Sequence, residues 1–146
     1  MARYDVIPLL GRTALVIWNE FKHYFELAAL EHPESVDMED VRARVADGRM
    51  MSIGIFDGVS MIAGAAVELY DARDGKTLHV RYLAGEHMEM WLEELQARLF
   101  EIAAAYGCRW LSLTGRQGWR KRLSNMGWNP VAIQMRCEVP GHGKCE

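Results

Sequence analysis

The stretch that decides the fold is residues 77–107, which read TLHVRYLAGEHMEMWLEELQARLFEIAAAYG. In its first part Leu78, Val80 and Tyr82 alternate with His79 and Arg81, and alternation with a period of two predicts a β-strand. From residue 86 onward the spacing changes to steps of three and four, in Met88, Leu92, Leu95, Leu99, Ile102 and Tyr106. That spacing predicts an amphipathic helix over residues 86–106, which Gly107 ends.

Two hairpin signals precede this strand. Asp57-Gly58 and Asp74-Gly75 are dipeptides that favour the tight turns between antiparallel strands. The runs 50–56 and 59–70 that flank them are apolar and rich in residues that favour strands. Together with residues 77–83 they predict an antiparallel meander of three strands in the middle of the chain.

The remaining patterns predict elements on both sides of this centre. Before it we expect a short strand over 4–7, a helix over 13–30, and a helix over 37–48 with Asp37 as its N-cap. After it we expect a buried strand over 110–113, a basic helix over 118–126 and a final strand over 130–139. The fold class is therefore α/β (α+β), with a mixed, mostly antiparallel central sheet and the order β-α-α-β-β-β-α-β-α-β. We expect one domain over residues 1–139 and a flexible tail over 140–146.

Composition narrows the class of protein. The chain has 146 residues, of which 50% are hydrophobic and 25% charged, as in an ordinary globular domain. No apolar run approaches the roughly 20 residues that a membrane-spanning helix needs, and the N-terminus, with Asp5, does not predict a secretion signal. Residues 1–75 hold 7 Lys or Arg against 13 Asp or Glu, whereas residues 76–146 hold 10 against 7. The second half is therefore only mildly basic, which argues against a general nucleic-acid binder.

The predicted order of elements resembles that of the GNAT superfamily of acetyl-CoA-dependent acyltransferases. The resemblance covers nearly the whole chain. It is carried by Leu78-His79-Val80-Arg81 leading into the long helix, by Gly107-Cys108-Arg109-Trp110-Leu111-Ser112-Leu113, and by Leu123-Ser124-Asn125-Met126-Gly127-Trp128. It implies that the fourth and fifth strands part to admit the pantetheine arm of acetyl-CoA, which a closed, filled gap would contradict.

The resemblance also implies a diphosphate-binding turn between the fourth strand and the long helix, written Gln/Arg-x-x-Gly-x-Gly/Ala. This chain has Tyr82-Leu83-Ala84-Gly85-Glu86-His87 there, so only Gly85 matches the pattern. If the chain binds acetyl-CoA, the diphosphate is expected at the backbone amides of Gly85, Glu86, His87 and Met88. Glu86 and Glu89 put two carboxylates in the first turn, where they satisfy the helix dipole and repel a diphosphate.

The family's general acid is a Tyr four residues before the final Gly, a position that Leu123 occupies here. Leucine cannot protonate a departing thiolate. Glu68 and His79, on the meander strands, are the candidate bases if the chain is active, although side chains there can also simply be solvated. With the altered turn, these departures favour a non-catalytic protein that needs no cofactor, and an active N-acyltransferase that uses acetyl-CoA is the alternative.

Residues 116–122 gather four cations around Trp119 at the start of a predicted helix. The pattern Gly-Arg-x-Gly-Trp-x-(Arg/Lys)-x-Leu-x-x-x-Gly-Trp, over residues 115–128, is similar to the ending of GNAT-like proteins of tailed phages and prophages. These include internal or connector-region virion proteins that keep the fold without the activity. The resemblance implies a virion structural or assembly component in the particle or the host cytoplasm, not secreted. Arg116, Trp119, Arg120 and Trp128 are the expected contact surface for other phage proteins.

Two further possibilities receive less support. Cys137, His142 and Cys145, with Cys108, have side chains that bind zinc, but no CxxC pair is present, so we expect no metal. A nucleic-acid-binding role for the basic helix is weakened by its modest charge. The sequence leaves self-association into a homo-oligomer open.

Overall fold

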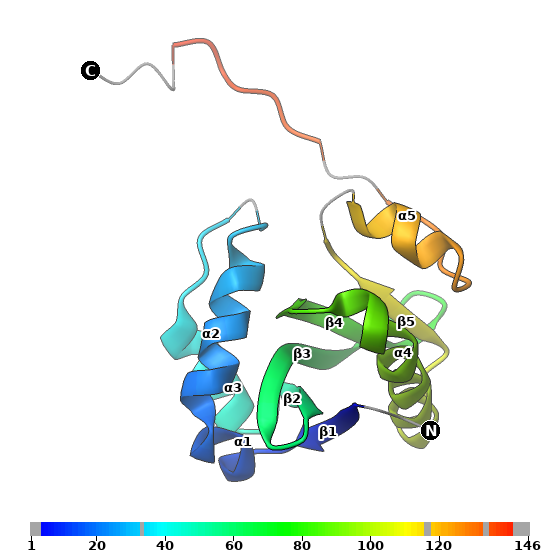
Figure 1. Ribbon diagram of the computed structural model, residues 1–146. Helices are drawn as coiled ribbons and strands as arrows, with labels where there is room; N and C mark the ends of the chain where they lie inside the picture. The colour runs from blue at the N-terminus through cyan, green and yellow to red at the C-terminus, as the bar shows by residue number, and fades with distance from the viewer. Residues whose placement is uncertain (1–3, 33, 116–117, 133–134, 142–146) are drawn as a thin grey trace. The chain divides into compact units, whose positions relative to one another are not determined.

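The computed structural model describes residues 4–32, 34–115, 118–132 and 135–141. The chain divides into two compact units, Met1–Arg116 and Gln117–Glu146. The first unit holds a sheet with helices on both of its faces, and the described residues of the second unit include one short helix (Figure 1). One domain over residues 1–139 with a tail from residue 140 stays a prediction. No helix in the described part of the chain combines the length and the apolar character that crossing a bilayer requires.

The sheet has five strands in the order β1-β2-β3-β4-β5. They are β1 (Asp5–Leu9), β2 (Met51–Asp57), β3 (Ser60–Ala72), β4 (Gly75–Gly85) and β5 (Trp110–Leu113). The first four pair antiparallel with their neighbours, and β5 pairs parallel to β4. This confirms the predicted meander and the mixed, mostly antiparallel sheet.

The helices of the first unit are α1 (Arg12–Val16), α2 (Trp18–Ala29), α3 (Met38–Ala46) and α4 (Met88–Ala105), and the second unit has α5 (Gly118–Ser124). Asp37 caps α3 as predicted, since its carboxylate accepts from the amide of Glu39 at 3.0 Å. The predicted single helix over 13–30 is wrong in one respect, because it breaks at Ile17, whose φ of −118° and ψ of 37° lie outside the helical region. The adjacent β-branched Val16 and Ile17 have low helix propensity, which weakens the helix at that point.

Two apolar layers cover the two faces of the sheet, and Figure 1 shows α2 and α4 on opposite sides of it. The layer under α1, α2 and α3 is built around Phe21 and Phe25, both fully buried. The layer under α4 contains Leu78 and Val80 of β4. Its largest member is Trp91, which is also fully buried and which the predicted stripe of α4 omitted.

The predicted final strand over residues 130–139 is wrong for the described residues of that segment. Residues 130–132 and 135–139 belong to no strand. Val131 is 93% exposed and Met135 85% exposed, so their apolar side chains are not covered as those of a sheet strand would be. The alternating sequence favours a strand, but alternation forms one only where a partner edge satisfies the backbone.

A buried hydroxyl in β2 yields the first stability prediction. Ser52 is completely buried, and its Oγ is without a hydrogen-bond partner in the described structure. Such a group is desolvated without compensation, so replacing it removes a cost. We expect Ser52→Ala to raise the free energy of unfolding by about 1 kcal/mol. Denaturant unfolding of both proteins measures this, and a Ser52→Ala protein that is less stable would contradict the prediction.

Candidate functional site

The parallel pairing between β4 and β5 covers only part of β4. It runs from Thr77 opposite Trp110 to Val80 opposite Leu113. Strand β4 continues through Gly85, still paired with β3 on its other side. Among the described residues, no strand pairs with residues 81–85 on the side of β5. The two strands therefore form a fork, which we define as the end of the ladder at Val80 and Leu113 with the open edge of residues 81–85.

A β-bulge lies at the base of the fork. Ala66 and Val67 are consecutive in β3, but their partners in β4 are Tyr82 and Val80, so Arg81 is the extra residue. The carbonyl of Arg81 lies 3.2 Å from Nε2 of His32, which follows the end of α2. A carbonyl oxygen only accepts, so Nε2 of His32 carries the proton and donates it. The bulge thus interrupts the pairing of β4 with β3 by one residue where the fork opens, and the pairing resumes from Tyr82 to Gly85.

The turn after β4 leads from the fork into α4. The amide of Glu86 donates to the carbonyl of Ile62 at 2.9 Å, and Nε1 of Trp91 donates to the carbonyl of Glu86 at 2.6 Å. These two bonds fix the turn to β3 and to the buried side of α4. Gly85 is required there, because a Cβ would stand 2.6 Å from the Cα of Ala63.

His87 is the N-cap of α4 and the only described residue other than glycine with a positive φ. Its φ of 56° and ψ of 41° are left-handed, a conformation that glycine adopts without strain. His87 stands at the second small position of the diphosphate-binding pattern, so the backbone keeps a glycine-like form although the side chain has changed. The His87 ring is exposed, and so are the side chains of Glu86 and Glu89, whereas Met88 is half-buried.

Tyr82, at the first position of that pattern, has its side chain in the core. It is 4% exposed and belongs to the apolar layer under α2. Its ring centroid lies 5.2 Å from that of His32 and 6.1 Å from that of Phe25. The residue therefore contributes to the core and does not offer its side chain to a phosphate at this turn.

A polar cluster lies on one face of the sheet beside the fork. Glu68 of β3 and Ser112 of β5 stand opposite His79 of β4 in the sheet register, so the three side chains share a face. Leu78 and Val80 pack under α4, so alternation puts this cluster on the opposite face. The structure thus brings together Glu68 and His79, the two candidate bases.

Both ring nitrogens of His79 have hydroxyl partners. Nδ1 lies 2.7 Å from Oγ of Ser112, and Nε2 lies 3.4 Å from Oγ1 of Thr114. The hydroxyl of Tyr70 lies 3.4 Å from the same Ser112 Oγ, and the rings of Tyr70 and His79 meet edge to face at 5.8 Å. The His79 side chain is thereby held from both sides, by Tyr70 of β3 and by Ser112 and Thr114 at the end of β5.

The surroundings of His79 favour its neutral form. Burial lowers the pKa of His79 below its ordinary value near 6.5, and the positive charges of Arg81 and His32 act in the same direction. The carboxylate of Glu68 opposes this change, but it also forms an ion pair with Arg81 at 3.3 Å. A neutral imidazole in this position has a lone pair that can accept a proton.

Sequence reasoning missed Tyr70, Ser112 and Thr114 as partners of His79. The spacing of these residues along the chain contains no motif, and their proximity depends on the register between β3, β4 and β5. Only the alternation within each strand was available from the sequence, and it does not align one strand with the next.

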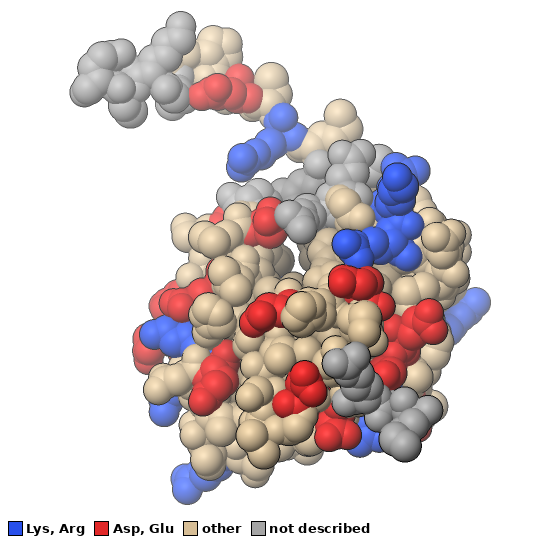
Figure 2. All heavy atoms as spheres, in the orientation of Figure 1, with Lys and Arg blue, Asp and Glu red and all other residues tan. Residues whose placement is uncertain are grey.

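Three of the four residues expected to form a contact surface, Trp119, Arg120 and Trp128, belong to the second unit. Trp119 and Trp128 are half-buried, Arg120 is exposed, and Arg116 lies outside the described residues. Lys and Arg side chains gather over α5 in Figure 2. Leu123, where the resemblance led us to look for a tyrosine, is 6% exposed and offers no proton. A contact role for these residues stays a prediction.

The expectation of no metal also stays a prediction. Within the described ranges no three His, Cys, Asp or Glu side chains come close enough to hold a metal ion. Cys108 and Cys137 are free thiols. His142 and Cys145 lie outside the described residues.

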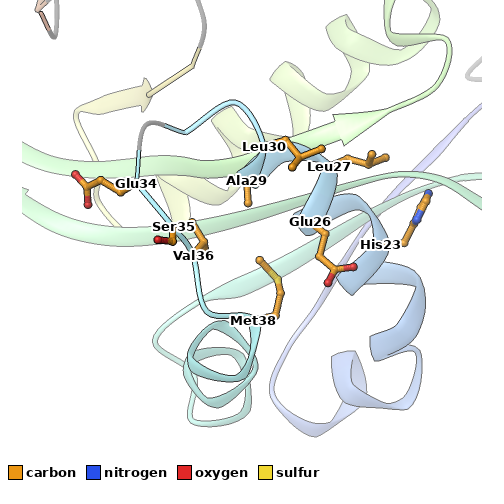
Figure 3. A pocket seen from close by; sticks show the side chains of 9 residues that line it. All are labelled: His23, Glu26, Leu27, Ala29, Leu30, Glu34, Ser35, Val36 and Met38. Atoms are coloured by element: carbon orange, nitrogen blue, oxygen red, sulfur yellow. The ribbon is translucent and has the colours of Figure 1, made fainter. Parts of the chain in front are cut away.

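A shallow pocket of about 510 Å³ lies between α2, α3 and the segment that joins them (Figure 3). Its lining residues are His23, Glu26, Leu27, Ala29, Leu30, Glu34, Ser35, Val36 and Met38. The α2 residues that pack on the sheet, such as Phe21 and Phe25, are not among them. The lining includes no residue of β4 or β5, and its polar residues, His23, Glu26 and Glu34, form no constellation typical of catalysis.

Comparisons with known proteins address the fold. No family model and no curated protein sequence matches the chain. Among solved structures, the aminoglycoside acetyltransferase HMB0005 from an uncultured soil metagenomic sample has a TM-score of 0.70 at 13% identity, over 93% of this chain and 98% of that one. The aminoglycoside acetyltransferase meta-AAC0020, from a similar sample and in complex with sisomicin, has a TM-score of 0.67 at 9% identity, over 94% and 97%.

A further similar structure is the aminoglycoside N-acetyltransferase AAC(6')-Iy in complex with CoA. Its TM-score is 0.65 at 12% identity, over 94% of this chain and 95% of that one. Identities this low establish the fold alone. The chain therefore has the fold of the GNAT acetyltransferases, as the sequence predicted.

Proposed function

We propose that the chain is an acyl-CoA-dependent N-acyltransferase that holds its acyl donor in the fork between β4 and β5. The observation that carries this proposal is the early end of the ladder at Val80 and Leu113, beyond which β4 runs on with an open edge. An extended chain with amide groups, such as the pantetheine arm of coenzyme A, can pair with an open edge as an added strand does. The similarity to an acetyltransferase in complex with CoA supports this choice.

The turn into α4 fits the diphosphate of the donor through its backbone. The first amides of a helix lack partners within the helix and point along its positive end, which attracts anions. The left-handed His87 keeps the backbone form that the pattern's small residue would have. Glu86 and Glu89 act against the fit, because their charges compete with the phosphates for the same dipole. We therefore expect binding that is weaker than an unhindered helix start would give.

We propose that His79 activates the amine that accepts the acyl group. A neutral imidazole beside the fork can act as a general base and take a proton from the attacking nitrogen of an amine. Glu68 lies next to it but is engaged with Arg81, so we assign the base to His79 and an electrostatic role to Glu68. The donor supplies the acyl group when bound, and the side chains of the cluster hold and move the proton.

The test is calorimetric titration of the full chain with coenzyme A at low salt. We expect a dissociation constant in the micromolar range, and tighter binding by Glu86→Gln/Glu89→Gln. Each carboxylate in the first turn interacts with the dipole by about 0.3–1 kcal/mol, which predicts about a 3- to 30-fold gain for the double variant.

The matched control is Glu93→Gln/Glu94→Gln, which makes the same charge change one turn further along α4. The dipole effect falls off within the first turn, so this variant should bind as the wild type does. Absence of binding at millimolar coenzyme A, in the wild type and in both variants, would contradict the proposal.

A non-catalytic role as a virion structural or assembly component is the second candidate function. The buried Leu123 favours it, because the chain has no acid where the resemblance puts the family's tyrosine. Arg116, Trp119, Arg120 and Trp128 would then contact other virion proteins. This candidate predicts that the chain co-purifies with phage particles and that charge reversal at Arg120 weakens the association. A chain that binds coenzyme A and is absent from particles would exclude it.

A further inference from the structure

We propose that Ser112 and Tyr70 position the ring of His79 and conduct to solvent the Nδ1 proton that the ring releases when it takes up another proton at Nε2. This inference rests on the proposed function, because it assigns partners to the base of that reaction. It also makes a claim about hydrogen bonding within the cluster that is testable in the absence of any substrate.

The geometry connects a buried ring to the protein surface. His79 is 9% exposed, Ser112 is half-buried and Tyr70 is 45% exposed. Two hydroxyl groups link Nδ1 of His79 to the surface. The Ser112 hydroxyl lies 2.7 Å from Nδ1, and the Tyr70 hydroxyl lies 3.4 Å from that of Ser112. Nε2, on the opposite side of the ring, lies near Thr114, which follows the last paired residue of β5 at the fork. One nitrogen thus faces the fork and the other faces a path to solvent.

The hydrogen-bond partners of His79 do not select one tautomer of its ring. A hydroxyl both donates and accepts, so Ser112 and Thr114 can satisfy either tautomer of a neutral imidazole. His32 provides the contrast within the same molecule, since the carbonyl of Arg81 can only accept and keeps the proton on Nε2. A ring with hydroxyl partners on both nitrogens is able to accept a proton on one side while releasing one on the other.

The proposed proton transfer balances without a further reactant. The ring begins as the Nδ1–H tautomer, and Nε2 forms a bond to the proton that leaves the amine nitrogen. The Nδ1 proton passes to Oγ of Ser112, the Ser112 proton to the hydroxyl of Tyr70, and the Tyr70 proton to water. The ring stays neutral and ends as the Nε2–H tautomer. It is reset when Nε2 gives its proton to the departing thiolate and Nδ1 regains one along the same chain.

In this reset His79 also acts as the general acid that protonates the departing thiolate. Leu123 stands where the family's acid is expected, so no side chain at that position protonates the thiolate. A single imidazole that accepts a proton and then returns one serves as both base and acid. The hydroxyl chain makes this feasible because the ring never has to hold a net charge in its buried site.

The first test reads the tautomer directly by nitrogen NMR of histidine-labelled full chain at pH 7.5. We expect the nitrogen shifts of His79 to lie between those of the two pure tautomers in the wild type. Ser112→Ala removes the acceptor for Nδ1–H, so the ring should move to the Nε2–H form, which Thr114 can still satisfy. His32 serves as the internal control and should stay Nε2–H in both proteins. A His79 tautomer ratio that Ser112→Ala leaves unchanged would overturn the inference.

The second test measures acetyl transfer from acetyl-CoA to a panel of primary amines that includes sisomicin. We expect Ser112→Ala and Tyr70→Phe to lower kcat by about tenfold, a part of the roughly 10²–10⁴-fold that a general base supplies, with little change in KM for acetyl-CoA. Ser60→Ala and Tyr106→Phe, at exposed sites elsewhere, are the matched controls. Absent turnover in the wild type overturns the proposed function, whereas turnover with unchanged kcat in both variants overturns only the proton path.

Discussion

Replacing Trp91 with alanine is expected to lower the free energy of unfolding by about 3–5 kcal/mol. Trp91 is fully buried and is the largest side chain of the layer between α4 and the sheet. Its removal leaves a cavity whose lining comes from strands and a helix that cannot collapse freely. The indole also donates to the carbonyl of Glu86 at 2.6 Å, so the change releases the turn that enters α4.

Chemical denaturation followed by circular dichroism measures the effect, with Phe100→Ala as the control on the same helix. Phe100 is 54% exposed, and its truncation should cost less than about 1 kcal/mol. Trp91→Phe keeps most of the volume but removes the indole N–H, so it should weaken coenzyme A binding more than its modest stability loss explains. A Trp91→Ala protein as stable as Phe100→Ala would show that α4 does not depend on this side chain.

Local patterns were enough to predict most of the fold. The dipeptides Asp57-Gly58 and Asp74-Gly75 lie at the turns between antiparallel strands, but the turn residues are 58–59 and 73–74, since Asp57 and Gly75 pair within the strands. Asp37 caps α3 as predicted. These features depend on neighbours in the sequence, which is why they could be predicted. The break at Ile17 and the burial of Trp91 depend on how helices pack against the sheet, and no short pattern encodes that.

The same distinction between local and long-range features applies to the candidate site. Gly85, Glu86, His87 and Met88 could be located because a turn between a strand and a helix is contiguous in sequence. Their backbone amides were the expected diphosphate ligands, but the left-handed, glycine-like backbone of His87 was not foreseeable from its side chain. The hydroxyl partners of His79 are Ser112 of β5 and Thr114 just beyond it, and Tyr70 of β3 contacts both His79 and Ser112, so the cluster required the register of two interstrand pairings. The sequence identified the imidazole, and only the fold identified its partners.

Replacing Gly85 with alanine is expected to destabilise the chain by about 3 kcal/mol or more and to abolish binding of coenzyme A. A Cβ at this position would overlap the Cβ of Ala63 and stand 2.6 Å from its Cα and 2.8 Å from the carbonyl oxygen of Ile62. Two of these atoms are backbone, and the carbonyl of Ile62 also accepts from the amide of Glu86 at 2.9 Å. The strain therefore has no flexible side chain to absorb it, and the turn must move away from β3.

Gly107→Ala is the matched control. It replaces a glycine where a Cβ meets no other atom, so it shows the effect of losing a glycine without the steric clash. Gly107 has a φ of +71° and no atom within 4 Å of a Cβ, so its replacement adds only the strain of a left-handed alanine, about 1 kcal/mol. Thermal unfolding and calorimetry on both variants give the comparison, and we expect Gly107→Ala to bind coenzyme A as the wild type does. Equal stability losses in the two variants would mean that the turn can shift from Ala63 at little cost. Retained binding by Gly85→Ala would mean that the phosphates do not depend on the amides that this turn presents.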